Sequence, residues 1–253
     1  MHDLEKRLKK ELQQNIKAKI MHSARWSIPI HSVEVEFIAV KRTKMDVLMK
    51  MMLITFQKAK IANAEQISEL LLVEQLFIQD LIEIMLKTRL IEKSESIYKL
   101  TDRGFQQLEN GVFEEEQEAE SQNVLYSPIH EAFLKGELKE ALEEPLDIYR
   151  YVKEDYLDEE LSLENEPIIH ALQANGLEKD QGDVLTVISE VISTTDLFIE
   201  DVPCLEFIIY NKEEDIIYAR VWNTLLGRWD EKLENQLNEK ERLEWRENYL
   251  GRQ

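Results

Sequence analysis

The segment Phe77–Gly104 constrains the fold of this chain more than any other. Its first part places Ile78, Ile82 and Met85 at helical spacing, which predicts an amphipathic helix that runs through Leu90. Two short segments, "LIEK" and "IYKL", follow with the polar turn "SES" between them, and they predict a two-stranded hairpin. Thr101 then precedes a second amphipathic pattern, which predicts that a new helix starts there with Phe105 and Leu108 on its inner side.

Two helices are predicted ahead of this segment. The stretch "KMDVLMKMMLITFQKAK" is too apolar to face water on every side, so it is interpreted as a core helix rather than as a methionine-rich binding surface. Asn63 is predicted to cap the next, short helix, with Gln66 placed as in a capping box. Ile67, Leu70 and Leu71 are predicted to form the inner stripe of that helix.

The predicted order is therefore helix, helix, helix, hairpin, helix. With "LTDRG" closing the hairpin, residues 45–111 resemble the bacterial winged helix-turn-helix class. The wing of such proteins often ends in a leucine–threonine pair followed by a glycine, here Leu100, Thr101 and Gly104. One position departs from that class, because Arg89 stands where a glycine often precedes the first wing strand. The resemblance implies a fold and names no particular family.

The rest of the chain completes a predicted α+β fold, with an N-terminal winged-helix domain and an acidic domain of helices plus a short antiparallel β-meander. Residues 1–44 are predicted as a basic amphipathic helix (3–20) and a strand (31–40) that lead into a winged-helix domain at 45–112. The acidic segment 113–123 is interpreted as a helix end or linker.

The acidic domain is predicted at 124–253, with helices starting at Ser127–Pro128, within 145–162, at 166–176 and at 183–193. The segments "TDLFIED", "CLEFIIY" and "DIIYARVWN" are predicted as the meander, and a charged helix ends the chain.

Charge is distributed unevenly, and this limits the partners of the chain. Residues 1–110 hold 18 basic and 15 acidic residues, whereas the remainder holds 13 basic and 36 acidic ones. The second half is therefore expected to repel nucleic acid and anionic membranes. Its acidity predicts either simple solubility or a docking surface for a basic partner.

The sequence predicts a cytoplasmic protein. It has no apolar run long enough to span a bilayer and no apolar signal core at its N-terminus. Its single cysteine, Cys204, excludes an internal disulfide and suits a reducing compartment. We expect a bacterial cytoplasmic location and no membrane partner.

The sequence predicts no catalytic or metal-binding site. The five histidines have no metal-ligand spacing, and there is neither a glycine-rich phosphate loop nor a nucleophile elbow. Carboxylate runs such as Asp158–Glu160 and Glu213–Asp215 are expected to be solvated faces in so acidic a chain. The expectation is a protein without enzymatic activity, cofactor or metal.

The early part of the helix after Val73 would read DNA in a helix-turn-helix protein, and here it is acidic. Its expected exposed residues form a predicted partner surface of Gln75, Gln79, Asp80 and Glu83, in which the carboxylates oppose phosphate. Contact with a nucleic-acid backbone is instead expected, if it occurs, from basic groups that precede this helix. These are Lys41, Arg42, Lys44, Lys50, Lys58 and Lys60. The alternative is that these groups are solvated or pair with acidic residues.

Two functions follow as hypotheses, and a third is an enzyme with a carboxylate site in the acidic domain. The first is a non-enzymatic winged-helix adaptor or assembly subunit of a larger bacterial complex, which could act on nucleic acid, with a protein partner or a second copy of the chain bound. The alternative is a DNA-binding transcriptional regulator whose acidic domain senses a signal or dimerises.

Overall fold

The computed structural model of the protein describes residues 1–14, 17–138, 145–152, 161, 163–177 and 182–251. The chain divides into two compact units that are discontinuous in sequence. Unit 1 comprises Met1–Val35, Gln122–Asn175 and Thr194–Gln253, and unit 2 comprises Glu36–Ser121 and Gly176–Ser193.

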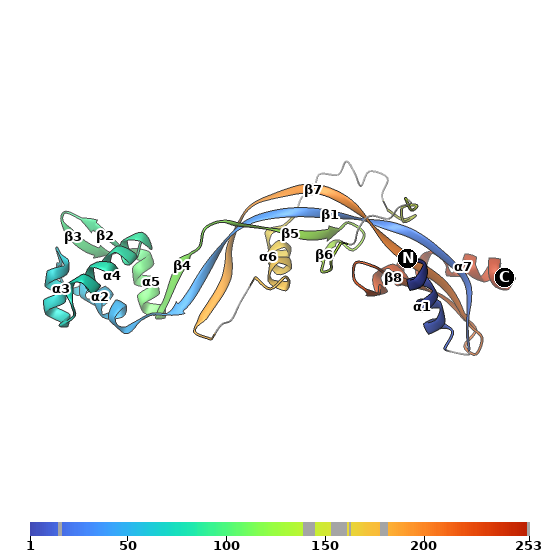
Figure 1. Ribbon diagram of the computed structural model, residues 1–253, viewed down its shortest axis with the longest axis horizontal. Coiled ribbons are helices and arrows are strands. Elements are labelled where there is room, and N and C mark those ends of the chain that lie inside the picture. Colours follow the sequence, from blue (N-terminus) through green and yellow to red (C-terminus); the bar gives the residue numbers. More distant parts are fainter. Residues whose placement is uncertain (15–16, 139–144, 153–160, 162, 178–181, 252–253) are drawn as a thin grey trace. The chain divides into compact units, whose positions relative to one another are not determined.

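Two long strands, β1 (Ala18–Lys44) and β7 (Val184–Asn211), contribute to both units (Figure 1). They lie side by side in a seven-stranded sheet of order β6-β5-β1-β7-β8-β9, in which β4 also pairs with β1. The remaining strands are short: β4 (Val112–Glu116), β5 (Glu120–Ser127), β6 (Ala132–Leu134), β8 (Ile216–Asn223) and β9 (Arg228–Trp229).

The predicted fold class, a helical winged-helix N-terminus followed by an acidic domain of helices and a short meander, is wrong. Strands make up 40% of the structure, and the large sheet replaces both the helical acidic domain and the short meander. The physical reason lies at residues 184–192, whose apolar residues fit a helix but are mostly β-branched. Beside β1, these residues form part of β7 instead, because β-branched side chains suit a paired strand and a short apolar run does not fix its own period.

Other predicted elements also differ from the structure, in most cases because the chain joins the large sheet. The N-terminal helix α1 (His2–Leu12) ends early, because the chain from Ala18 onward joins the sheet. Residues 113–123, expected as a linker, contribute to β4 and β5, and the helix expected at Pro128 is a turn followed by β6. The helix expected within 145–162 is a non-helical segment at 145–152, and the part at 153–160 lies outside the described residues.

In unit 2, local signals predicted the elements well. Helices α2 (Val47–Lys58), α3 (Ala64–Leu71) and α4 (Gln75–Lys87) precede a hairpin of β2 (Ile91–Ser94) and β3 (Ile97–Leu100), and α5 (Asp102–Asn110) follows (Figure 1). Their shared core includes Met45, Met49, Met52, Ile67 and Ile82, so the methionine-rich helix is a core helix, as predicted.

The end of the hairpin is fixed by three local contacts. Thr101 caps α5 by accepting a hydrogen bond from the Gly104 N–H at 3.0 Å, and its own hydroxyl donates to the Arg89 carbonyl at 2.7 Å. Gly104 is required because a Cβ there would lie 2.1 Å from the Leu90 carbonyl oxygen. Arg89 itself has φ +56°, a left-handed conformation, which explains why a glycine would suit this position.

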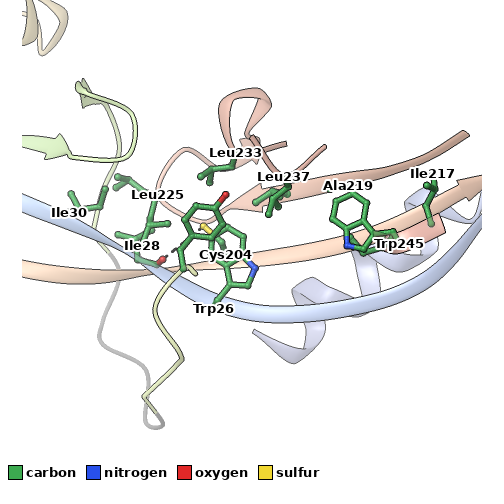
Figure 2. Close-up of a cluster of buried hydrophobic side chains, with 14 residues drawn as sticks. Trp26, Ile28, Ile30, Cys204, Ile217, Ala219, Leu225, Leu233, Leu237 and Trp245 are labelled. Carbon is green, nitrogen blue, oxygen red and sulfur yellow. Dashed lines mark hydrogen bonds between the residues drawn. The ribbon is translucent and has the colours of Figure 1, made fainter. Parts of the chain in front are cut away.

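Unit 1 contains helices α1, α6 (Asn165–Ala174) and α7 (Glu231–Leu250). The predicted helix at 166–176 and the C-terminal helix are thus present. Figure 2 shows the main core of the unit, where Trp26 and Ile28 of β1 and Cys204 of β7 lie in one cluster with Leu233 and Leu237 of α7. A second cluster, around the fully buried Leu8, packs α1 against Leu205, Phe207 and Ile209 of β7.

Helix α7 also covers the edge of β8. The N–H groups of Ala219 and Val221 donate to the side chains of Asn238 and Glu234 at 2.9 and 3.1 Å. These side chains satisfy backbone groups that would otherwise be open for pairing with another strand.

Candidate docking site

Large apolar side chains are exposed where α3 turns into α4 in unit 2. Leu70, Leu72, Leu76 and Phe77 are 60, 91, 64 and 54% exposed. They come from the last turn of α3, the connecting turn and the first turn of α4. We call these four residues the α3–α4 patch. Single exposed leucines are ordinary, but a cluster within one short turn indicates a contact surface.

The turn that carries the α3–α4 patch is well bonded. Leu72 has φ +56° and ψ +42°, and its N–H donates to the Ser68 carbonyl, which also accepts from the Val73 N–H at 3.2 Å. The Ser68 hydroxyl in turn donates to the Val73 carbonyl at 2.6 Å. A leucine in this left-handed conformation is strained by about 1 kcal/mol relative to glycine. Leu72 is thus an exposed apolar residue at a position whose backbone conformation favours glycine.

Acidic side chains surround the α3–α4 patch. Glu65 and Glu69 are exposed on α3, Glu74 precedes α4, and Asp80 and Glu83 are exposed on α4. The residues predicted as a partner surface all lie exposed on α4, namely Gln75, Gln79, Asp80 and Glu83. The face combines apolar groups with negative charge, which suits a basic, partly apolar ligand.

Sequence reasoning missed the apolar half of this face. It assigned Leu70 to the inner stripe of α3, and Phe105 of α5 to the interior as well, yet Leu70 is 60% and Phe105 is 47% exposed. The available signal was the run Leu70–Val73, because four consecutive apolar residues cannot all lie on one face of a helix.

Three of the basic groups predicted for nucleic acid lie on β1, and two of these three are opposite acidic residues of β4. The antiparallel register places Lys41 beside Glu115 and Arg42 beside Glu114. The Arg42 Nε donates to Glu114 at 2.8 Å, while Lys44 is opposite Val112. Pairing with acidic residues, the alternative to phosphate contact, is therefore realised for Arg42.

The other three predicted basic groups, Lys50, Lys58 and Lys60, are exposed on α2 or just after it. The structure thus divides the predicted basic set into a strand group, in which Lys41 and Arg42 are opposite carboxylates, and a helix group. It does not bring all six residues together on one element.

Unit 1 contains a serine–histidine–aspartate chain that joins the residue types of a hydrolase triad, but the serine contacts the histidine Nδ1 here, whereas in a triad it contacts Nε2. The Ser127 Oγ lies 2.7 Å from the His130 Nδ1, and the His130 Nε2 lies 3.0 Å from an Asp230 carboxylate oxygen. A nucleophile must be reachable by its substrate, whereas Ser127 is fully buried and Asp230 is the N-cap of α7. We interpret the chain as a structural connection between the 128–131 turn and α7.

The electrostatics of Asp230 agree with that structural role. Burial raises the pKa of its carboxyl, but hydrogen bonds from His130, Asn223 and the Leu233 N–H outweigh burial, so the pKa lies below its ordinary value. His130 and Asp230 are 100 positions apart in the chain, so spacing could not have indicated this pair.

The most extensive ionic network joins the 145–152 segment to β7 and α7. Arg150 donates to the buried Glu206 at 2.9 and 3.1 Å and to Glu241 at 2.7 Å. The Trp26 Nε1 also donates to Glu206, at 2.6 Å. Burial lowers the pKa of Arg150, but the hydrogen bonds to both carboxylates raise it above its ordinary value. None of the buried side-chain polar atoms left without a partner in the described part of the chain belongs to this network.

Two kinds of feature are absent from the described residues. No group of three or more His, Cys, Asp or Glu side chains is placed to hold a metal ion there. Within the same residues, no helix combines the length and the apolar character that a membrane span needs. Cys204 is fully buried, and burial raises the pKa of its thiol, as suits an inert core cysteine.

No protein-family model, curated protein or solved structure matches this chain, so its resemblance to winged helix-turn-helix proteins stays a prediction.

Proposed function

We propose that the protein is an adaptor or assembly subunit, and that the α3–α4 patch is the surface through which it binds a protein partner. The observation that carries the proposal is that the four side chains of the α3–α4 patch are exposed around a turn that a Ser68–Val73 hydrogen bond closes. The expected ligand is a protein segment that is apolar along one side and basic around it.

The energetics favour a binding role for this patch. Full burial of a leucine or phenylalanine side chain contributes about 1.5 to 3 kcal/mol, so a partner that covers the patch gains free energy that offsets the cost of association. A few buried apolar anchors commonly dominate such interfaces. The surrounding carboxylates would select a basic partner and speed its encounter.

The helices at the two ends of the chain are less suitable docking elements than their sequences indicate. Helix α1 buries Leu8 completely against β7, and Glu5 on the same helix is bonded to Arg25 of β1. Helix α7 buries Leu233, Leu237 and Trp245. Their apolar faces are thus used within unit 1, and the proposal rests on unit 2 alone.

A photo-reactive amino acid in place of Leu72 tests the proposal in cells of the source organism. We expect cross-linked adducts to a protein, and we expect them to disappear when Leu76→Glu is added. The matched control is the same photo-reactive residue in place of Leu243, which is 79% exposed on α7 of unit 1. Equal adducts at both positions, or adducts that survive Leu76→Glu, would contradict the proposal.

The alternative of a DNA-binding regulator has less support from the geometry. The first turn of α4 presents Leu76 and Phe77, and Arg42 is paired with Glu114. Titration of a random duplex at low salt distinguishes the two functions. A regulator would bind the duplex with a steep salt dependence, and charge reversal of Lys50 and Lys58 would weaken this binding. The adaptor is expected to bind no duplex.

A further inference from the structure

A second exposed apolar surface lies on α2 of the same unit. Val47 and Met51 are 70 and 45% exposed, and Ile54 is half-buried one turn further on. The spacing of four and three residues places all three on one line along the helix. Lys50 and Lys58 are exposed beside this line. We call Val47, Met51 and Ile54 the α2 stripe.

The α2 stripe has the chemistry that the α3–α4 patch would select. It is an apolar helical line flanked by lysines, and the patch is an apolar turn flanked by carboxylates. Asp46, the acidic residue that precedes Val47 in the chain, is the N-cap of α2 and accepts from the Leu48 N–H at 2.8 Å. The two surfaces are therefore complementary in charge and alike in apolar character.

The stripe and the patch do not meet within one copy of the protein. The buried sides of α2 and α4 face a common core, which contains Met49 and Met52 of α2 together with Ile78 and Ile82 of α4. The exposed sides of both helices point away from that core. The complement of each surface must therefore come from another molecule.

We propose that the α3–α4 patch of one copy binds the α2 stripe of a second copy, so that the chain assembles head to tail. This proposal rests on the proposed docking function of the patch and names its partner. Because the two surfaces differ, each bound copy still offers a free patch at one end and a free stripe at the other. Such heterologous contacts extend to a ring or a filament and do not stop at a dimer.

The expected association is weak and sensitive to conditions. The two surfaces are small, and interfaces below about 1,200 Å² are typically transient. The net charge of −20 also makes whole molecules repel one another. At about 0.1 M salt the Debye length is about 10 Å, so this long-range repulsion is reduced while ion pairs in contact persist. Association should therefore be measured at high protein concentration in moderate salt.

Two variants of the full chain, each with one of the two surfaces disrupted, test the proposal by sedimentation velocity. Leu76→Glu removes the patch and keeps the stripe, and Val47→Glu removes the stripe and keeps the patch. Both side chains are exposed and both lie in a first helical turn, where glutamate is favourable, so folding should be retained. We expect the unsubstituted chain to form species larger than two copies and each variant alone to remain monomeric.

The decisive sample is an equimolar mixture of the two variants. One intact patch and one intact stripe then remain, so we expect a species with the mass of two chains and nothing larger. Leu243→Glu is the matched control and should associate like the unsubstituted chain. If either variant fails to fold by circular dichroism, Phe77→Glu or Met51→Glu replaces it, since both side chains are also exposed.

Three results would overturn the proposal: a monomeric unsubstituted chain, a mixture without the two-chain species, or continued association of either variant alone. Cross-links from position 72 to a different protein, with no self-association, would leave the docking function standing and reject only the second copy as its partner.

Discussion

The Ser68 hydroxyl of α3 donates a hydrogen bond to the carbonyl oxygen of Val73, 2.6 Å away across the turn into α4. This contact closes the loop that holds Leu72 outward, at 91% exposure. The apolar face of the turn is therefore presented by a defined structure, and its parts can be removed separately.

Ser68→Ala removes this hydrogen bond and leaves the α3–α4 patch unchanged in composition. We expect the free energy of unfolding to fall by about 1 kcal/mol, because one hydrogen bond is lost and the Val73 carbonyl loses its side-chain partner. We also expect fewer cross-links from position 72, since the turn is less ordered. Urea unfolding measures the first effect. Ser94→Ala, at a half-buried serine whose hydroxyl accepts from the Lys99 Nζ at 3.3 Å, is the control and should change neither quantity.

Leu72→Asn separates stability from binding. Asparagine tolerates the left-handed conformation better than leucine, so we expect the free energy of unfolding to rise by about 0.5 to 1 kcal/mol. Binding should weaken at the same time, because an apolar anchor is lost. A clear loss of stability in urea unfolding would instead show that Leu72 packs within its own unit, against the docking role.

Arg150→Met removes both guanidinium hydrogen bonds to the buried Glu206 carboxylate and leaves the hydrogen bond from the Trp26 indole N–H. We expect the free energy of unfolding to fall by about 3 kcal/mol, as when a buried charge loses its partner. Arg150→Lys should fall between this variant and the unsubstituted chain, because a lysine cannot donate to two carboxylates in the same planar geometry. Trp26 lies in the same network, so tryptophan fluorescence during urea unfolding follows the change.

If the network contributes nothing, Arg150→Met and the unsubstituted chain will unfold at the same urea concentration. Arg42→Met is a matched control, because the Arg42–Glu114 pair is largely exposed and its loss should cost less than about 1 kcal/mol.

Glu5 makes stability depend on pH in the acid range. Its hydrogen bond with Lys9, together with the hydrogen bonds and charge of Arg25, lowers the pKa of its carboxyl from 4.5 to about 2 in spite of partial burial. A carboxyl whose pKa is depressed by folding stabilises the folded state above its ordinary pKa, and this stabilisation is lost as the pH falls from 4.5 towards about 2.

We therefore expect Glu5→Gln to lower the free energy of unfolding by about 1 to 2 kcal/mol at neutral pH. The difference from the unsubstituted chain should shrink below pH 4.5 and vanish near pH 2. Glu11→Gln, on an exposed position of the same helix, is the control. A difference that stays constant over this pH range would show that the side chain acts by packing and not by charge.

Local sequence determined the elements whose signals are complete within a few residues. The Asn63 and Thr101 caps accept from the N–H groups of Gln66 and Gly104, three residues on in each case. The hairpin turns at Glu95 and Ser96, both with positive φ. Such signals act through neighbouring backbone atoms, so they are readable without knowledge of the rest of the chain.

Only the tertiary structure decided the features that depend on which distant segments pack against a residue, namely its secondary structure, its ion pairs and its burial. Residues 184–192 have no fixed period of their own, and their place beside β1 in the sheet makes them a strand. Arg42 meets Glu114, 72 positions later, which turns an expected phosphate ligand into half of an ion pair. Leu70 has the spacing of a core residue, yet no described element covers it. Burial and pairing depend on which distant segments pack against a residue, and the sequence information that fixes this packing is spread over the whole chain.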